Sequence, residues 1–244
     1  MRRIPLLVLA GTALALLALP DRGQPAPKPK EKERPQGGPI TTEMLHESSN
    51  NLKQIALAFH NFNDAMGTLP VNQLAKDGKP LLSWRVQILP YIEQDQLYKQ
   101  FKFDEPWDSE NNKKLIDKMP ELYAPVRGKA DPGMTFYQTF GGSNGWMKKG
   151  ASIPRSFPDG TSNTLMCAEA ARPVIWTKPD DMVFDGKKVP ELGGMFDGRF
   201  HAAMGDGSVR RFRKGVDPDV LKLLIDPADG MVLPRDWGLD PDEK

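Results

Sequence analysis

The chain is poor in the residue types on which many binding and catalytic sites depend. It has one cysteine, Cys167, and three histidines. A single cysteine excludes an internal disulfide and any metal centre built from several thiolates. Because Cys167 lies in an apolar run and no histidine is near it in sequence, we expect a small, buried, unreactive side chain.

An excess of charge is also missing. The sequence has 33 Lys and Arg against 32 Asp and Glu, a formal net charge of +1. A nucleic-acid-binding domain normally carries a basic excess on one face, so nucleic acid is not an expected partner. Phosphate-binding loops, dinucleotide fingerprints, zinc-protease helices and nucleophile elbows are absent as well. We therefore predict a non-catalytic binding or structural module, not an enzyme, with no cofactor, no bound metal and no assigned catalytic residue.

What is present begins with an export segment. Arg2 and Arg3 precede an uncharged run rich in Leu and Ala, from Ile4 to Leu19, and polar, Pro-rich chain follows. This order is typical of a secretory signal. The run is shorter than the ~20 residues that cross a bilayer comfortably, although such runs can be retained. We assign residues 1–26 to a signal peptide or an N-terminal membrane anchor. The expected location is extracytoplasmic: periplasm, cell surface or secreted, with membrane attachment where the segment stays uncleaved.

Residues 27–40 are rich in Pro, Lys and Glu and predict an extended linker. The helix expected at 42–65 opens a domain over 41–230. Polar residues such as Asn51 lie off its apolar stripe, and Gly67 is a stop signal. The stripe consists of Leu45, Leu52, Ile55, Phe59 and Phe62.

Shorter elements are expected further along the chain. Ser83 and Ser109 each precede a helical pattern, and each is expected to cap the first turn of its helix. Pro90 should break the helix that follows Ser83. The C-terminal half favours short strands, a hairpin and a final helix, before a loose acidic tail at 231–244. The strands are expected at 135–140, 164–168, 195–201 and 208–212, with the last two paired through the turn at 205–207, and the helix at 219–225. Helices followed by antiparallel strands define an α+β fold.

Several ordered motifs support a family assignment. They are NNLKQIALAFHNF at 50–62, GTLP at 67–70, SWRVQILPYIEQ at 83–94, PWDS at 106–109, DGTSNT at 159–164, WTKP at 176–179 and FHAAMGDGSV at 200–209. Together they resemble a large bacterial family of prepilin-like exported proteins of unassigned function, domain-of-unknown-function family 1559. The resemblance implies a pilin-like fold: a long N-terminal helix packed on a small antiparallel sheet with extra short helices. It implies no reaction.

The sequence departs from the family pattern in two places. Members commonly begin with a leader that resembles Gly-Phe-Thr-Leu-Ile-Glu, whereas Arg3 is followed here by Ile4 and Pro5. Members also often carry two cysteines at the positions that Ser48 and Ala124 occupy in this chain. The first departure argues against assembly into a filament through the leader helix. Pseudopilin-like association with its own kind or with other envelope proteins remains the expected partnership.

One residue pair offers an alternative function. His201 and Asp206 stand at the two ends of the predicted hairpin turn, where a carboxylate could orient an imidazole base. On that interpretation the protein is an extracytoplasmic hydrolase, with or without a metal. On the simpler interpretation, which we favour, Asp206 caps the backbone of its own turn. Asp- and Gly-rich turns such as 159–160 and 185–186 could supply oxygen ligands to Ca²⁺, but none has the alternating acidic ladder of a calcium loop.

Overall fold

The computed structural model describes residues 38–242. The predicted export segment and most of the predicted linker lie outside the described residues. Helix α1 spans Thr42–Met66, as the apolar stripe predicts. The Thr41 hydroxyl accepts the Met44 N–H at 3.3 Å and caps the first turn. Gly67 ends the helix in the left-handed conformation, with φ of 73°, which glycine adopts at little cost.

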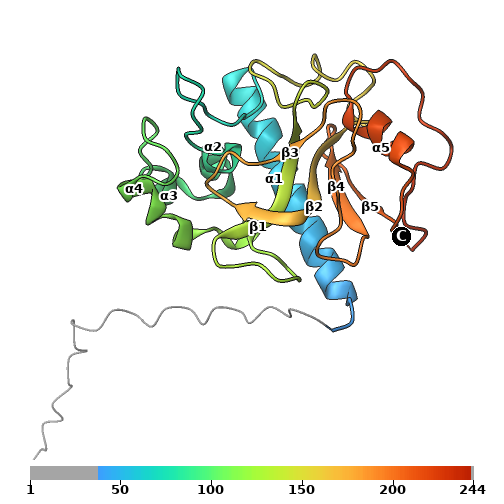
Figure 1. The fold of residues 1–244 in the computed structure, drawn as a ribbon, viewed down its shortest axis with the longest axis horizontal. Helices are drawn as coiled ribbons and strands as arrows, with labels where there is room; N and C mark the ends of the chain where they lie inside the picture. The colour runs from blue at the N-terminus through green and yellow to red at the C-terminus, as the bar shows by residue number, and fades with distance from the viewer. Residues whose placement is uncertain (1–37, 243–244) are drawn as a thin grey trace, which may run out of the picture. The chain divides into compact units, whose positions relative to one another are not determined.

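Short helices and 3₁₀ turns follow α1 and cover one end of the sheet (Figure 1). Ser83 caps the first of them by accepting the Arg85 N–H, and Ser109 caps another by accepting the Asn112 N–H. The helical pattern at 83–101 breaks at Pro90, as expected. The elements are α2 at Trp84–Gln87, 3₁₀ turns at Leu89–Ile92, Ile116–Lys118 and Glu121–Tyr123, α3 at Asp95–Tyr98 and α4 at Glu110–Lys113.

Five strands form one sheet in the order β3-β1-β2-β4-β5. Their bounds are β1 Met134–Gly141, β2 Leu165–Ile175, β3 Met182–Val183, β4 Phe200–Met204 and β5 Val209–Phe212. The central pairs are antiparallel, but β3 runs parallel to β1. The α+β class is therefore confirmed, and the purely antiparallel sheet that we expected is corrected to a mixed one. A two-residue strand has too little sequence pattern to be foreseen.

The hairpin is confirmed with a shifted start. β4 pairs with β5 through the turn at 205–207, but β4 begins at Phe200 and not at residue 195. A bridge between Phe196 and Arg199 folds the preceding residues into a tight turn of their own, with Asp197 at φ of 57°. β2 in turn continues to Ile175, well past the expected end at 168.

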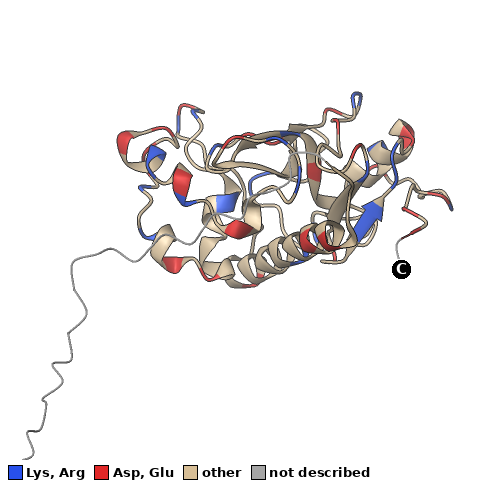
Figure 2. Ribbon diagram, turned by 90° about the horizontal axis from the view of Figure 1, so that it is seen from below, with Lys and Arg blue, Asp and Glu red and all other residues tan. Residues whose placement is uncertain are grey.

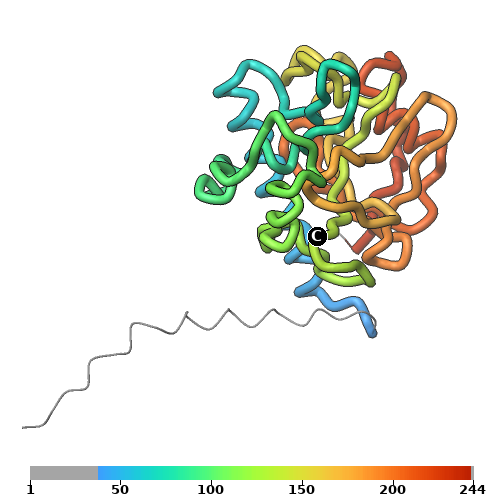
Figure 3. Tube along the Cα trace, turned by 60° about the vertical axis from the view of Figure 1, so that its left-hand side comes forward, coloured from blue at the N-terminus to red at the C-terminus, as the bar shows by residue number. Residues whose placement is uncertain are grey.

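Helix α1 packs against β2, β4 and β5, and helix α5, at Pro218–Ile225, packs against β2. Figures 1 and 3 show α1 running along the sheet, with the green helical segment on one side of the body and the red C-terminal segment on the other. The stripe residues Leu52, Ile55 and Phe59 are fully buried in the larger core cluster. A second cluster lies under α5. The sheet is therefore covered on both faces.

The C-terminal residues differ from the loose tail that we expected. Leu239 bridges to Phe212, and Trp237 packs edge-on against the same ring at 6.2 Å. Arg213 holds Asp236 through two hydrogen bonds, of 2.7 and 2.8 Å. Acidic composition suggested a solvated tail, but Trp237 and Leu239 pack at the β5 edge, whereas Met231 and Val232 are exposed.

Charges of both signs are scattered over the ribbon in Figure 2, in agreement with the balanced composition. Among residues 38–242, no helix has the length and apolar character needed to cross a membrane.

Candidate functional site: the β3 pocket

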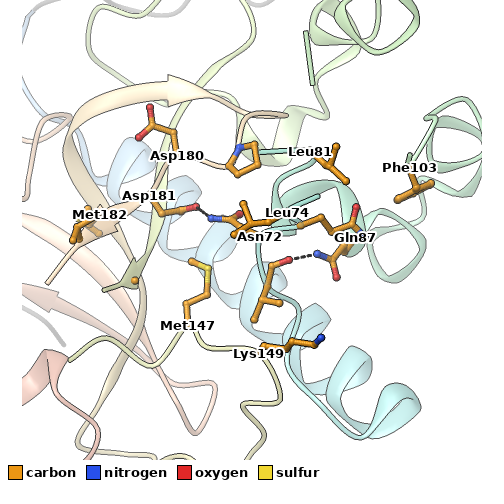
Figure 4. Close-up of a pocket in the computed structure, with 15 residues that line it drawn as sticks. Asn72, Leu74, Leu81, Gln87, Phe103, Met147, Lys149, Asp180, Asp181 and Met182 are labelled. Carbon is orange, nitrogen blue, oxygen red and sulfur yellow. Dashed lines mark hydrogen bonds between the residues drawn. The ribbon is translucent and has the colours of Figure 1, made fainter. Parts of the chain in front are cut away.

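A pocket of about 890 Å³ lies beside the edge strand β3 (Figure 4). We call it the β3 pocket. Its walls come from the connection between α1 and α2, from α2 itself, from the segment after β1 and from the residues that lead into β3. The polar lining consists of Asn72, Gln73, Gln87, Lys149, Asp180 and Asp181, and the apolar lining includes Leu74, Leu81, Phe103, Met147 and Val183.

Asp181 joins these walls. Its Oδ1 accepts hydrogen bonds from the Trp84 indole N–H at 3.0 Å and from the Thr139 backbone N–H at 2.9 Å. Its Oδ2 accepts the Asn72 amide at 2.9 Å, a contact visible in Figure 4. Asn72 in turn accepts the Trp84 backbone N–H at 3.1 Å. The pocket wall is thus tied to β1 and α2 by hydrogen bonds to one carboxylate.

The charge of Asp181 is balanced by Arg85, whose side chain is completely buried. Nη2 of Arg85 lies 2.9 Å from Asp181 Oδ1. The same guanidinium donates to the Tyr137 carbonyl at 2.8 and 3.0 Å and to the Ser83 hydroxyl at 2.8 Å. Burial of a charge is costly unless it is paired and its other donors are satisfied, and both conditions are met here. The pair makes this pocket wall a fixed part of the fold.

The floor and the mouth of the pocket have different character. Gln87 donates its amide to the Val71 carbonyl. Figure 4 marks this hydrogen bond at the labelled Gln87 side chain. Gln73 lines the pocket with a buried Oε1 that has no hydrogen-bond partner among the described residues. At the mouth, Leu74 and Val183 leave 59% and 69% of their surface exposed. The site therefore combines amide and charged groups with apolar side chains, and small-ligand sites likewise pair apolar walls with a few placed polar groups.

A second polar cluster is buried between α1 and the sheet. Glu169, fully buried on β2, accepts the His201 backbone N–H at 2.8 Å and faces His201 Nδ1 at 3.0 Å. Ser48 donates to the same carboxylate and lies 2.7 Å from the Tyr137 hydroxyl. The Asn51 amide also donates to Tyr137, at 3.2 Å. Helix α1 and strand β4, far apart in sequence, thus both contact one carboxylate of β2.

This cluster decides how His201 and Asp206 relate. The imidazole of His201 pairs with the carboxylate of Glu169 and not with that of Asp206. Asp206 is exposed in the turn, where it accepts the Ser208 backbone N–H at 2.9 Å. The turn-capping role that we favoured for Asp206 is therefore confirmed. The pairing on which the hydrolase alternative depended is replaced by a Glu–His pair that sequence spacing did not reveal.

Within the described part of the chain, the acidic turn residues considered as metal ligands do not cluster around a common point. Among the described residues, no three His, Cys, Asp or Glu side chains are grouped so that they could hold a metal ion. Asp159, one of the turn residues considered for Ca²⁺, accepts the Gly230 N–H at 3.1 Å. Burial and the neighbouring Asp159 and Asp226 raise the pKa of Asp229 above its usual value. Mutual repulsion within this acidic group is the physical origin of part of that shift.

Cys167 lies on β2, fully buried, as expected. Burial raises the pKa of its thiol well above the usual range, because the thiolate would lose its hydration. We predict that Ellman's reagent leaves Cys167 unmodified in the native protein, since the thiolate is the reactive form. After unfolding in guanidinium chloride one equivalent should react. Fast native-state modification would contradict both the burial and the raised pKa.

Sequence reasoning missed Asp181, Arg85 and Glu169. One signal was available for Glu169, because it is a charge in the middle of the apolar strand at Leu165–Ile175. A charge on a buried strand requires a partner. Nothing local in the sequence singles out Asp181 from the adjacent Asp180, which forms ion pairs at the surface with Arg172 and Lys178.

The fold and its sites define an α+β domain in which one long helix covers a mixed sheet and a preformed pocket opens at the sheet edge. Residues 46–127 match the family described as Protein of unknown function (DUF1559), which confirms the resemblance seen in the motifs. The comparisons with curated proteins and with solved structures gave no match.

Proposed function

We propose that this protein is an exported cell-envelope protein of pseudopilin-like type, that it serves as a non-catalytic binding module, and that the β3 pocket is its ligand site. The export segment at 1–26 supports the extracytoplasmic location, either free or membrane-attached. The packing of α1 along the sheet supports the pseudopilin-like layout. Its partners on this proposal are other envelope components or further copies of itself, and not nucleic acid.

The observation that carries the binding role is the buried, unpaired Oε1 of Gln73 in the wall of a preformed pocket. A buried acceptor without a donor is costly, and a ligand that supplies the donor removes that cost. The apolar rim at Leu74 and Val183 favours a partly apolar ligand. Short neutral peptides, which offer N–H donors and apolar side chains, fit both requirements.

Side-chain amide signals in nuclear magnetic resonance spectra report directly on this site. Titration with a pool of neutral, apolar-rich tripeptides should shift the side-chain amide signals of Asn72, Gln73 and Gln87. Leu74→Asp should abolish these shifts, because it places a charge at the apolar rim. Leu57→Asp is the matched control, because Leu57 is equally exposed, at 60%, on α1 and does not line the pocket. Shifts that survive Leu74→Asp, or that occur elsewhere only, would contradict the assignment of the site.

A further inference from the structure

A second pocket, of about 600 Å³, also borders the edge strand β3. We call it the β2–β3 pocket. Its lining comes from the outer part of β2, from β3 and from the loop that follows β3. The residues that it shares with the β3 pocket are Asp180, Asp181, Met182 and Val183. One short stretch of chain at the sheet edge thus borders two cavities.

The two cavities lie on opposite faces of the sheet. Asp181 points toward Asn72 in the β3 pocket, as Figure 4 shows. The next side chain, Met182, belongs to the core cluster under α5, and so does Ala170, which lines the β2–β3 pocket. Side chains alternate between the two faces along a strand. A strand added beyond β3 would therefore place alternate side chains over the two pockets.

The backbone of Val183 faces this sheet edge. In the sheet order, β3 is an outer strand and pairs with β1 (Figure 1). The Phe184 N–H donates to the Gly141 carbonyl at 2.9 Å, and the Phe184 carbonyl accepts the Asn144 N–H at 3.2 Å. Successive residues of a strand direct their backbone groups to opposite sides, so the N–H and C=O of Val183 point away from β1. An outward donor and acceptor at a sheet edge form a template for another strand.

The charges of the two pockets favour an uncharged occupant. The charged lining residues are Lys149, Arg172, Lys188, Asp180, Asp181, Asp185 and Glu191. Two of these acids also pair with bases outside the lining, Asp181 with Arg85 and Asp180 with Lys178. Neither sign is in clear excess, so the lining complements a segment without net charge. The apolar side chains of the β3 pocket, such as Leu74 and Val183, favour an apolar side chain there.

We propose that an extended, uncharged peptide segment of another protein adds to β3 as a further strand. Its backbone exchanges hydrogen bonds with the N–H and C=O of Val183. One apolar side chain enters the β3 pocket, and the next side chain, a polar one, lies over the β2–β3 pocket. In this recognition mode the main-chain hydrogen bonds supply affinity and the alternate pockets supply specificity. The inference rests on the peptide site proposed for the β3 pocket and adds how the peptide is held.

Capped pentapeptides test the strand addition in titrations of the full chain. The probe is acetyl-Ser-Val-Ser-Val-Ser-amide, and the side-chain amide signals of Gln73 and Gln138 report on the β3 pocket and the β2–β3 pocket. Both signals should shift. N-methylation at successive peptide positions should alternate between loss of binding and little effect, because only every second N–H faces β3.

The outcomes separate this inference from the proposed function. Equal effects of N-methylation at all positions, with the Gln73 shift retained, would overturn strand addition and leave the β3 pocket as a ligand site. A shift of Gln73 without a shift of Gln138 would have the same meaning. Absence of both shifts would overturn strand addition and the peptide assignment of the β3 pocket together.

Variants of the edge strand provide an independent measurement. Val183→Pro should weaken peptide binding at least about tenfold, because it removes the outward N–H. Proline is tolerated on an edge strand where the N–H faces solvent, so the melting temperature should stay close to that of the wild type. Val183→Thr keeps the N–H and reduces the apolar surface, so it should weaken binding less than Val183→Pro does. Val232→Pro, at a valine that is 89% exposed and lines neither pocket, should leave binding unchanged.

Two results with these variants would contradict the proposal. A greater loss of binding with Val183→Thr than with Val183→Pro would show that the contact is apolar and would overturn strand addition. Self-association of the protein in analytical ultracentrifugation that Val183→Pro abolishes would assign the edge to a second copy of this chain and would overturn the assignment to another protein.

Discussion

Asp181→Ala should destabilise the protein by about 3–5 kcal/mol, the usual cost of removing one partner from a buried ion pair. The substitution leaves the completely buried Arg85 guanidinium without its counter-charge. It also removes the acceptor for the Trp84 indole, the Thr139 N–H and the Asn72 amide. Urea denaturation followed by Trp fluorescence measures the loss as a fall in the free energy of unfolding.

Asp180→Ala is the matched control for this prediction. Asp180 is the preceding residue, but its ion pairs with Arg172 and Lys178 lie at the surface. Exposed pairs of this kind contribute about 0–1 kcal/mol, so the control should remain close to wild type. A double variant that replaces both Arg85 and Asp181 by apolar residues should lose less than the sum of the single losses, because no unpaired charge is left. Equal effects of Asp180→Ala and Asp181→Ala would contradict the role assigned to Asp181.

Glu169→Ala should have an effect of similar size, about 3–5 kcal/mol. Glu169 is fully buried. Its carboxylate accepts hydrogen bonds from Ser48 and from the His201 backbone N–H, and it also contacts His201 Nδ1. Each buried donor that loses its acceptor costs about 1–3 kcal/mol. Thermal and urea unfolding, monitored by circular dichroism, measure the loss.

Two further variants separate the role of the carboxylate from that of its size. Glu169→Gln keeps the shape and one acceptor oxygen, so it should cost less than the alanine substitution. Glu191→Ala, at an exposed glutamate beside the same strand, should change stability by no more than about 0.5 kcal/mol. A wild-type stability for Glu169→Ala would show that the cluster contributes nothing to the fold.

In the β3 pocket both carboxylates of the lining, those of Asp180 and Asp181, are paired with basic residues, so the amides and the apolar rim suit a ligand of low net charge. The buried acid Asp181 supports the pocket wall from within the core, and Glu169 joins α1 to β4 through Ser48 and His201. The two stability predictions therefore concern the acids that hold the pocket wall and the packing of α1 on the sheet in shape.

The sequence by itself determined the local elements of this protein. The apolar stripe and Gly67 set the length of α1, Pro90 divided the helical pattern at 83–101, and the turn at 205–207 paired β4 with β5. These signals act between residues that are close in sequence, so one chain is enough to interpret them. The family resemblance at 46–127 was also visible in the motifs.

Only the tertiary structure decided the parallel pairing of β3, the packing of the C-terminal residues and the partners of the buried charges. Arg85 meets Asp181, and Ser48 meets Glu169, across 96 and 121 positions of sequence. Which acid neutralises which base depends on strand order and on how α1 lies on the sheet, and no local pattern encodes either. His201 illustrates the difference: the sequence placed it beside an acidic turn, whereas the fold gave it a buried glutamate from the neighbouring strand.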